Sequence, residues 1–243
     1  RALVIGQHEY WDHYLSGTDV DARNMYNKFL NNPPYGKMEK LQGWLDVSGR
    51  GILSEISKTF AGADNNSVSI FYYSGHGSSD GYIFGTDNPY AGSGAVSSTE
   101  LANALKQIPG KIVVILDCCH SGYHINKSMS EEDIAAFNAN IINAFKAVDV
   151  VSKTPGQMAN SKFHVLTASS KTEVSWGSST GGVFTKALVN AKDRNSDGFV
   201  SIGEGYWAAK AYDNVPIYSE GQYYYQHVQC YPSANDPLLL WKK

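Results

Sequence analysis

Two short motifs in this sequence combine a thiol with an imidazole. Residues 74–77 read Ser-Gly-His-Gly, and residues 117–122 read Asp-Cys-Cys-His-Ser-Gly. A cysteine that faces a histidine provides a nucleophile and a general acid/base, which is the minimal pair for acyl transfer. We therefore expect Cys119 to attack and His76 to move the proton. The backbone N–H of Gly77, together with that of the cysteine, would form an oxyanion hole.

The choice between the adjacent cysteines follows from the strand-like run that precedes them. Side chains alternate between the two faces of a strand, so Asp117 and Cys119 point to one face and Cys118 to the other. We therefore expect Cys118 to pack into the core as a small apolar residue. Each motif alone also fits a simpler interpretation, either a buried cysteine or a glycine turn, whereas their combination favours chemistry.

A twelve-residue loop, 193–204, has oxygen-bearing residues at the spacing of an EF-hand. Such loops bind hard cations, so the pattern predicts Ca²⁺. We expect a structural ion, because a single loop is present where EF-hands usually pair and the Cys/His pair needs no metal. The alternative is an Asx-rich turn that binds no metal. The candidate ligands are Asp193, Asn195, Asp197, the Phe199 carbonyl and Glu204, with Gly198 at the turn and Ser201 at the ninth position.

Short apolar runs alternate with stretches of helical periodicity along the chain. The runs are rich in β-branched and aromatic residues, as strands are, and the stretches between them have one apolar side, as amphipathic helices do. This alternation predicts an α/β fold with a mainly parallel central sheet flanked by helices. Ligands of such sheets bind beyond the carboxyl ends of the strands, where both motifs lie. The predicted strands are 2–6, 68–73, 111–116 and 163–167, with 37–46 and 237–241 as further ones, and the predicted helices are 19–30, 52–60, 99–107, 131–148, 183–192 and 204–212.

The length and composition suit one folded unit. The chain has 243 residues, of which 42% are hydrophobic and 18% charged, enough for one sizeable core. We expect a single domain over residues 1–243. Its first part, 1–122, contains both motifs, a linker or insertion follows over 123–162, and the last part, 163–243, contains the calcium loop.

The charge and the cysteine count exclude several classes of protein. A net charge of −3 and a pI near 6.2 argue against nucleic-acid binding through a basic patch. No apolar run is long enough to span a bilayer. Three cysteines, two of them adjacent, do not form a disulfide framework. We expect a monomer.

The composition favours one cellular location, and the first residue indicates processing of the chain. Extracellular Ca²⁺ and a composition rich in Tyr and Asn favour a secreted or cell-surface location. The chain starts without Met, at Arg1, directly before the first predicted strand. We interpret it as a trimmed or processed product, and removal of an upstream pro-segment after a basic residue is one route to it.

The two motifs in their strand context resemble the caspase-like cysteine peptidases, and most of all the metacaspase and bacterial caspase-homologue branch. The resemblance extends over nearly the whole chain. It includes the first strand, the Gly-x-x-x-Asp-Ala start of the helix after Gly17, and the segments 166–170 and 182–188. It implies the caspase–hemoglobinase fold and endopeptidase activity. It also implies that Cys119 is the nucleophile and that His76 is the acid/base and helps to polarise the scissile carbonyl.

The metacaspase resemblance also implies a substrate preference. Asp21 and Asp117 match positions of the S1 pocket in that branch, which cleaves after Arg or Lys. A buried pair of carboxylates without a basic neighbour favours a cationic guest, and a guanidinium pairs with a carboxylate in bidentate fashion. Asp19 is an alternative to Asp21. The simpler interpretations are a charge at a helix N-terminus for Asp21 and a strand-end turn for Asp117. Thr18 stands where metacaspases often have a cysteine, which leaves the finer shape of the pocket open.

We also expect self-processing, and two other functions are alternatives to the peptidase. Caspase relatives often cleave the segment between their larger and smaller parts, here Tyr123–Ser161. The other functions are a catalytically inactive caspase-fold binding or scaffold protein, and a Cys/His transpeptidase. The lysines in or beside the segment, which are candidate sites of self-cleavage, are Lys127, Lys146, Lys153 and Lys162.

Overall fold

The centre of the molecule is a six-stranded sheet with the strand order β2-β1-β3-β6-β7-β11. The structure is a computed structural model, and it describes residues 1–88, 94–119, 131–149, 160–170, 181–219 and 222–243. Neighbouring strands from β2 to β7 are parallel, and β11 runs antiparallel to β7. The predicted α/β fold with a mainly parallel central sheet is confirmed. The strands of this sheet are β1 (Ala2–Gly6), β2 (Leu41–Leu45), β3 (Val68–His76), β6 (Lys111–Cys119), β7 (Phe163–Ser170) and β11 (His227–Tyr231).

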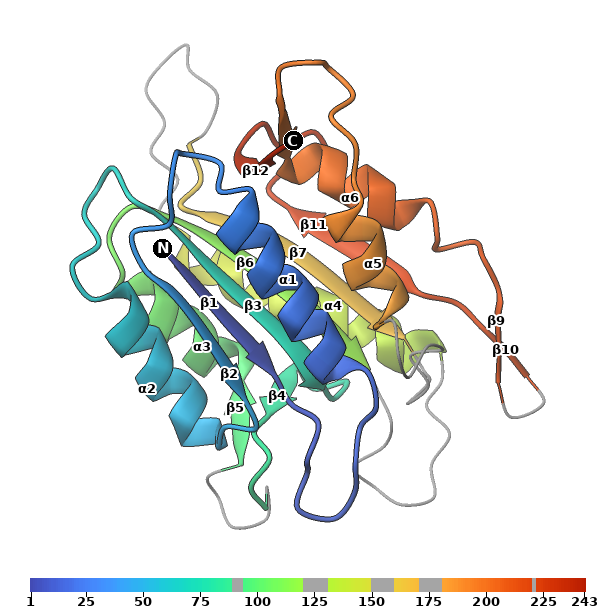
Figure 1. The fold of residues 1–243 in the computed structure, drawn as a ribbon. Coiled ribbons are helices and arrows are strands. Elements are labelled where there is room, and N and C mark those ends of the chain that lie inside the picture. Colours follow the sequence, from blue (N-terminus) through green and yellow to red (C-terminus); the bar gives the residue numbers. More distant parts are fainter. Residues whose placement is uncertain (89–93, 120–130, 150–159, 171–180, 220–221) are drawn as a thin grey trace.

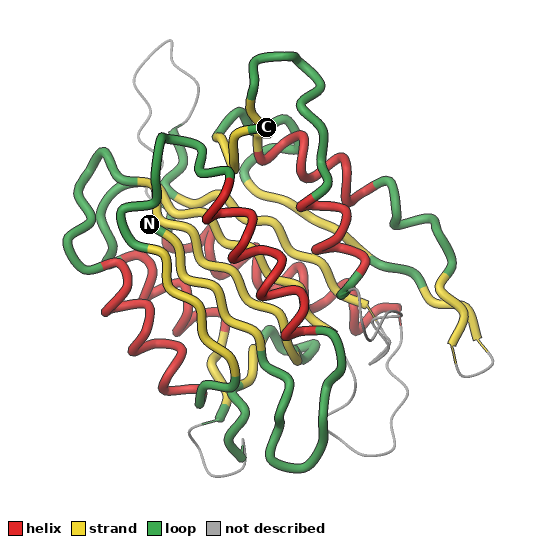
Figure 2. The backbone as a smooth tube through the Cα atoms, viewed as in Figure 1, coloured by secondary structure: helices red, strands yellow, loops and turns green. Residues whose placement is uncertain are grey.

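Helices cover both faces of this sheet (Figures 1 and 2). One face packs against α1, α5 and α6, and the other against α2, α3 and α4. This arrangement explains why the strand sequences are nearly continuous apolar runs, since a strand covered on both faces has no side that meets water. The helices are α1 (Thr18–Asn31), α2 (Gly49–Phe60), α3 (Ser98–Lys106), α4 (Glu131–Val148), α5 (Val183–Val189) and α6 (Ile202–Lys210).

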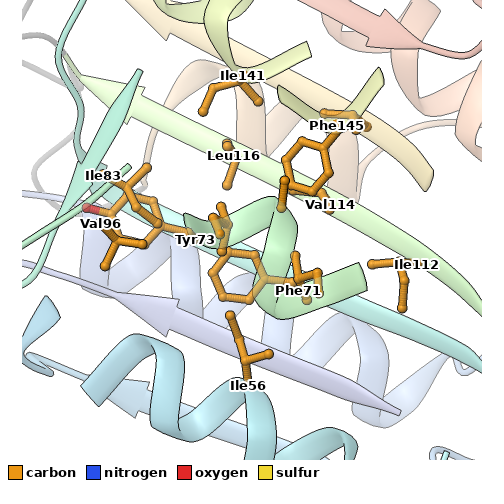
Figure 3. Packing of buried hydrophobic residues seen from close by; sticks show 14 of the residues in the cluster. Ile56, Phe71, Tyr73, Ile83, Val96, Ile112, Val114, Leu116, Ile141 and Phe145 are labelled. Atoms are coloured by element: carbon orange, nitrogen blue, oxygen red, sulfur yellow. The ribbon is translucent and has the colours of Figure 1, made fainter. Parts of the chain in front are cut away.

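Alternate residues of each strand belong to two separate hydrophobic clusters. In β6, Val114 and Leu116 enter the cluster under α2, α3 and α4, part of which Figure 3 shows, whereas Val113 and Ile115 enter the cluster under α1, α5 and α6. All four side chains are fully buried. The period of two along the strand therefore builds both halves of the core from one sequence.

Two helices begin with a capping box. At α3 the side chain of Ser97 accepts from the N–H of Glu100, and the Glu100 carboxylate accepts from the N–H of Ser97. The start of α3 at Ser98 lies one residue before that of the predicted helix 99–107. Ser201 and Glu204 form the same arrangement at the start of α6. Each box satisfies backbone donors that have no partner inside the helix.

The C-terminal part departs from the sequence expectation. The predicted last strand exists as β12 (Leu239–Lys242), but it pairs antiparallel with β8 (Phe199–Ser201) outside the central sheet. The sixth strand of the central sheet is β11, which the sequence analysis did not predict, because its five residues have only one fully buried side chain, that of Val228. Two further hairpins complete the described part: β4 (Tyr82–Phe84) with β5 (Ala95–Ser97), and β9 (Ile217–Ser219) with β10 (Gln222–Tyr224). Within the described residues no helix has the length and apolar character needed to cross a bilayer.

Candidate active site

The ends of β3 and β6 bring the two motifs together. These strands pair in parallel register, with Ser74 opposite Asp117 and His76 opposite Cys119. Neighbouring strands in a sheet lie about 4.8 Å apart. The residue predicted as the nucleophile and the residue predicted as its acid/base therefore occupy one rung at the carboxyl edge of the sheet.

His76 is fully buried, and two tyrosines hold its backbone. Its N–H donates to the Tyr10 hydroxyl at 2.7 Å, and its carbonyl accepts from the Tyr73 hydroxyl at 2.9 Å. A Cβ atom on Gly75 would lie 2.5 Å from the Tyr73 hydroxyl oxygen and 2.7 Å from that of Tyr10. The first glycine of the motif is therefore required by the close approach of these two hydroxyls.

The second glycine of the motif, Gly77, lies under α4. A Cβ atom there would lie 2.9 Å from the ring of Phe137 and 3.1 Å from the Cβ atom of Cys118. Gly77 also forms an isolated antiparallel bridge with Ile83 of β4. The backbone after His76 is thus fixed from two sides, as a preorganised donor of an oxyanion hole must be. The role of Gly77 in such a hole stays a prediction.

The sequence analysis missed a second histidine at this site. His13 lies in the loop between β1 and α1, and its Nε2 atom is 2.6 Å from Nε2 of His76. Its Nδ1 atom is 2.6 Å from a carboxylate oxygen of Asp12. The signal was present, because residues after each strand of a parallel sheet meet at one edge. His13 lies in the loop that follows β1, so the same rule brings it to the ends of β3 and β6.

The alternation of side chains at the end of β6 follows the prediction. Cys118 is 1% exposed and belongs to the cluster under α2, α3 and α4. Asp117 points to the opposite face, where its Oδ2 atom accepts from the Thr185 hydroxyl of α5 at 2.7 Å. The prediction that Cys118 is a core residue is confirmed.

Asp117, which is partly buried, and Asp21, which is buried, lie on the same face and interact electrostatically. Asp21 is 1% exposed, and its oxygens accept from the N–H of Gly182 at 2.6 Å and from the hydroxyl of Ser74 at 3.2 Å. Burial raises the pKa of Asp21 well above its ordinary value, and the charge of Asp117 raises it further. Burial likewise raises the pKa of Asp117 to about 6. Two carboxyl groups in one desolvated place resist joint ionisation unless a cation joins them.

The alternative residue Asp19 has a partner of its own. Its carboxylate forms an ion pair with Arg23, one turn along α1, with an N–O distance of 2.7 Å. Thr18, at the position where metacaspases often have cysteine, donates its hydroxyl to the carbonyl of Gln7 at 2.7 Å. The structure therefore brings Asp21, and not Asp19, together with Asp117. The role of either residue in substrate binding stays a prediction.

The predicted calcium loop has the turn that its sequence requires. Gly198 has a φ angle of +87° and donates its N–H to Asp193 at 2.9 Å. The Asn195 side-chain oxygen accepts from the N–H of Asp197 at 3.0 Å. Glu204 accepts from the N–H groups of Arg194 and Ser201. Among the described residues, no three acidic, His or Cys side chains converge as a ready metal cluster. Metal binding would therefore exchange the amide contacts of Glu204 for coordination.

The candidate sites of self-cleavage divide into two groups. Lys146 lies in the last turn of α4, with its ammonium 5.5 Å from the ring centre of Tyr231. Lys162 donates its ammonium to the carbonyl of Ile108. The ammonium groups of both lysines therefore contact other parts of the folded chain. Lys127 and Lys153 lie outside the described residues.

Comparison with known proteins assigns the family. Residues 1–203 match the sequence profile of the caspase domain. The chain therefore belongs to the caspase-domain family, which makes it a caspase-like cysteine peptidase of clan CD. A solved structure of pro-sf-caspase-1 has a TM-score of 0.61 and 13% identity, with 98% of this chain and 93% of that chain covered. At this identity the likeness shows the fold alone. No curated protein matches the chain.

Proposed function

We propose that this chain is a cysteine endopeptidase that hydrolyses peptide bonds after Arg or Lys. The observation on which the proposal rests is the register that places Cys119 opposite His76. Membership of the caspase-domain family supports the reaction class. The neighbouring carboxyl groups of Asp21, which is buried, and Asp117, which is partly buried, support the basic preference.

The reaction follows from the two groups. The sulfur of Cys119 attacks the scissile carbonyl carbon, and its proton passes to His76. The carbonyl oxygen becomes an oxyanion, which the N–H groups of Gly77 and Cys119 stabilise. When the C–N bond breaks, His76 returns the proton to the leaving amine. Water then hydrolyses the thioester and regenerates the thiol.

Asp21 and Asp117 would bind the side chain of the residue before the scissile bond. A guanidinium or ammonium between them would remove the repulsion that burial imposes on the pair. The hydrogen bonds from Gly182, Ser74 and Thr185 already orient both carboxyl groups. Substrate binding would therefore cost little conformational entropy in these two side chains.

A positional peptide library tests the proposal. Wild type should cleave after Arg or Lys, and Cys119→Ala should not cleave at all. Asp117→Asn and Asp21→Asn should lower kcat/KM for basic substrates on the order of 100-fold, since each loses a buried charge pair with the guest. Asp19→Asn is the matched control, because Asp19 lies on the same helix and is already paired with Arg23. Cleavage after Asp, or none by wild type, would overturn the proposal.

The same assay separates the two other functions. A transpeptidase would transfer the acyl group to an added amine, and the product mass would contain that amine. A binding or scaffold protein would keep its function in Cys119→Ala. Hydrolysis with unmodified product masses supports the peptidase.

Self-processing and calcium belong to the same proposal. We propose that the enzyme cleaves its own segment between residues 123 and 161, and that wild type incubated beside Cys119→Ala will show new, smaller masses that the variant lacks. Identical intact masses would contradict this.

We also propose one structural Ca²⁺ in the loop 193–204, supported by the oxygen ligands at each EF-hand position and by the turn at Gly198. Such a loop fits a secreted or cell-surface enzyme.

A further inference from the structure

The loop between β1 and α1, residues 7–17, places a second imidazole against the candidate catalytic histidine. Nε2 of His13 lies 2.6 Å from Nε2 of His76, and Nδ1 of His13 lies 2.6 Å from a carboxylate oxygen of Asp12. The side chains of His13 and Asp12 are 31% and 27% exposed, whereas His76 is fully buried. The three side chains form a chain of hydrogen bonds from the surface to the reaction centre.

The protons in this chain can be assigned from donor and acceptor chemistry. An ionised carboxylate only accepts, so Nδ1 of His13 must donate to Asp12. A neutral imidazole has one donor and one acceptor nitrogen, so Nε2 of His13 is then the acceptor. With Asp12 ionised and His13 neutral, the hydrogen between the rings belongs to Nε2 of His76. In this tautomer Nδ1 is the acceptor nitrogen of His76.

We propose that His13 is a positioning residue for the reaction, and that it fixes His76 in the tautomer whose Nδ1 atom receives the thiol proton of Cys119. This inference rests on the proposed peptidase function. When His76 becomes an imidazolium, its Nε2–H becomes a charge-assisted donor to His13, and Asp12 stabilises the charge from behind. The logic is that of any base held by a third group.

The loop is held well enough to act in this way. The ring of Tyr10 stacks on that of His13 at 5.4 Å with an interplanar angle of 12°, and it lies 4.3 Å from the ring of His76. The N–H of Trp11 donates to the carbonyl of Thr86 at 3.0 Å. At the base of the loop, the backbone N–H of His8 donates to the carboxylate of Asp46 at 2.7 Å. Among the described residues, His13 and Tyr10 of the loop and Tyr73 of β3 are titratable groups that contact His76, and Cys119 is its register partner on β6.

Activity measurements with matched variants test the role of His13. His13→Ala should lower kcat/KM about 10- to 100-fold, mainly through kcat, because a general acid/base contributes about 10²- to 10⁴-fold when well placed. His13→Gln should restore most of the loss, since its amide oxygen can accept from Nε2 of His76. His8→Ala is the control, because it removes another histidine of the same loop.

Three kinetic outcomes would overturn the inference. The first is unchanged kcat/KM in His13→Ala, and the second is an equal loss in His8→Ala, which would indicate loop disorder. The third is a gain of activity in His13→Ala, because the contact would then be an inhibitory latch.

A measurement without turnover separates this inference from the proposed function. In protein with ¹⁵N-labelled histidine, the ring shifts should show His76 protonated at Nε2, with a ¹⁵N–¹⁵N coupling to His13. Both signals should vanish in His13→Ala and remain in Cys119→Ala. Coupling in a wild type that hydrolyses no peptide overturns the proposed function and leaves the pairing supported. An active wild type with His76 protonated at Nδ1 overturns the inference alone.

Discussion

Asp117 is a partly buried acidic residue whose ionisation opposes folding. Burial raises its pKa from the ordinary 3.8 to about 6, despite the stabilising hydrogen bond from Thr185. The folded chain therefore holds a proton on this carboxyl that the unfolded chain releases near pH 3.8. The stability contributed by that proton is complete below the unfolded value and is lost as the pH rises through about 6.

Replacing Asp117 by Asn should therefore stabilise the fold in a pH-dependent way. The amide stays neutral and its oxygen can still accept from Thr185. At pH 8 the melting temperature should rise by several degrees, at about 2–4 °C per kcal/mol for a chain of this size. At pH 4 it should change little, because wild-type Asp117 is already protonated there. Thermal melts followed by circular dichroism at both pH values check this, with Asp19→Asn as control. An equal gain at both pH values would show that the titration of Asp117 is not the cause.

At the scale of elements, the periodicity of apolar residues predicted those strands and helices whose position depends on their own sequence. The strands around Ile70, Val113 and Val165 and the capped start of α3 were predictable, because each has its own apolar or capping pattern. The partner of β12 was not, since pairing of a short strand depends on what lies beside it in space. The same holds at the site. The spacing of the motifs predicted that His76 and Cys119 meet, but the contact of His13 arises from the path of a loop.

The loop 193–204 and helix α6 share Glu204, which allows a sharp test of calcium binding. Glu204 closes the predicted loop and also forms the capping box with Ser201. We expect Ca²⁺ to raise the melting temperature of wild type over that measured with a chelator, and Glu204→Gln to lose this difference. Glu100→Gln changes the same kind of capping box at α3, remote in sequence from the loop, and should keep it. Calorimetric scans with Ca²⁺ and with chelator give the melting temperature of each protein under both conditions. A wild-type melting temperature that is the same with Ca²⁺ and with chelator would rule out the site.

At the scale of the whole molecule, the last forty residues complete a fold whose family match ends at residue 203. They supply β11 to the central sheet and β12 to the pair with β8. Trp241 of β12 is fully buried in the cluster under α1, α5 and α6, 6.2 Å from the ring of Phe29. The C-terminal strand is therefore packed onto the first helix of the chain.

Trp241→Ala should consequently destabilise the whole fold. The loss should be about 3–5 kcal/mol, as for other large buried aromatic side chains. Trp207→Ala, at a side chain that is 44% exposed, should cost far less. Denaturant titrations of both variants give the comparison, and peptide hydrolysis per folded molecule should stay unchanged. Similar losses in the two variants would show that β12 is not part of the cooperative core.

In the proposed substrate pocket, the raised pKa values of Asp21 and Asp117 would link the choice of substrate to pH. Because burial raises the pKa of Asp117 to about 6, a cationic side chain that binds between the two acids at mildly acidic pH should displace protons into solvent. Calorimetric titration of an Arg-containing peptide into Cys119→Ala should therefore give a heat that depends on the ionisation enthalpy of the buffer. Under the proposed specificity, recognition of basic residues should weaken as the medium becomes acidic and recover as it becomes neutral.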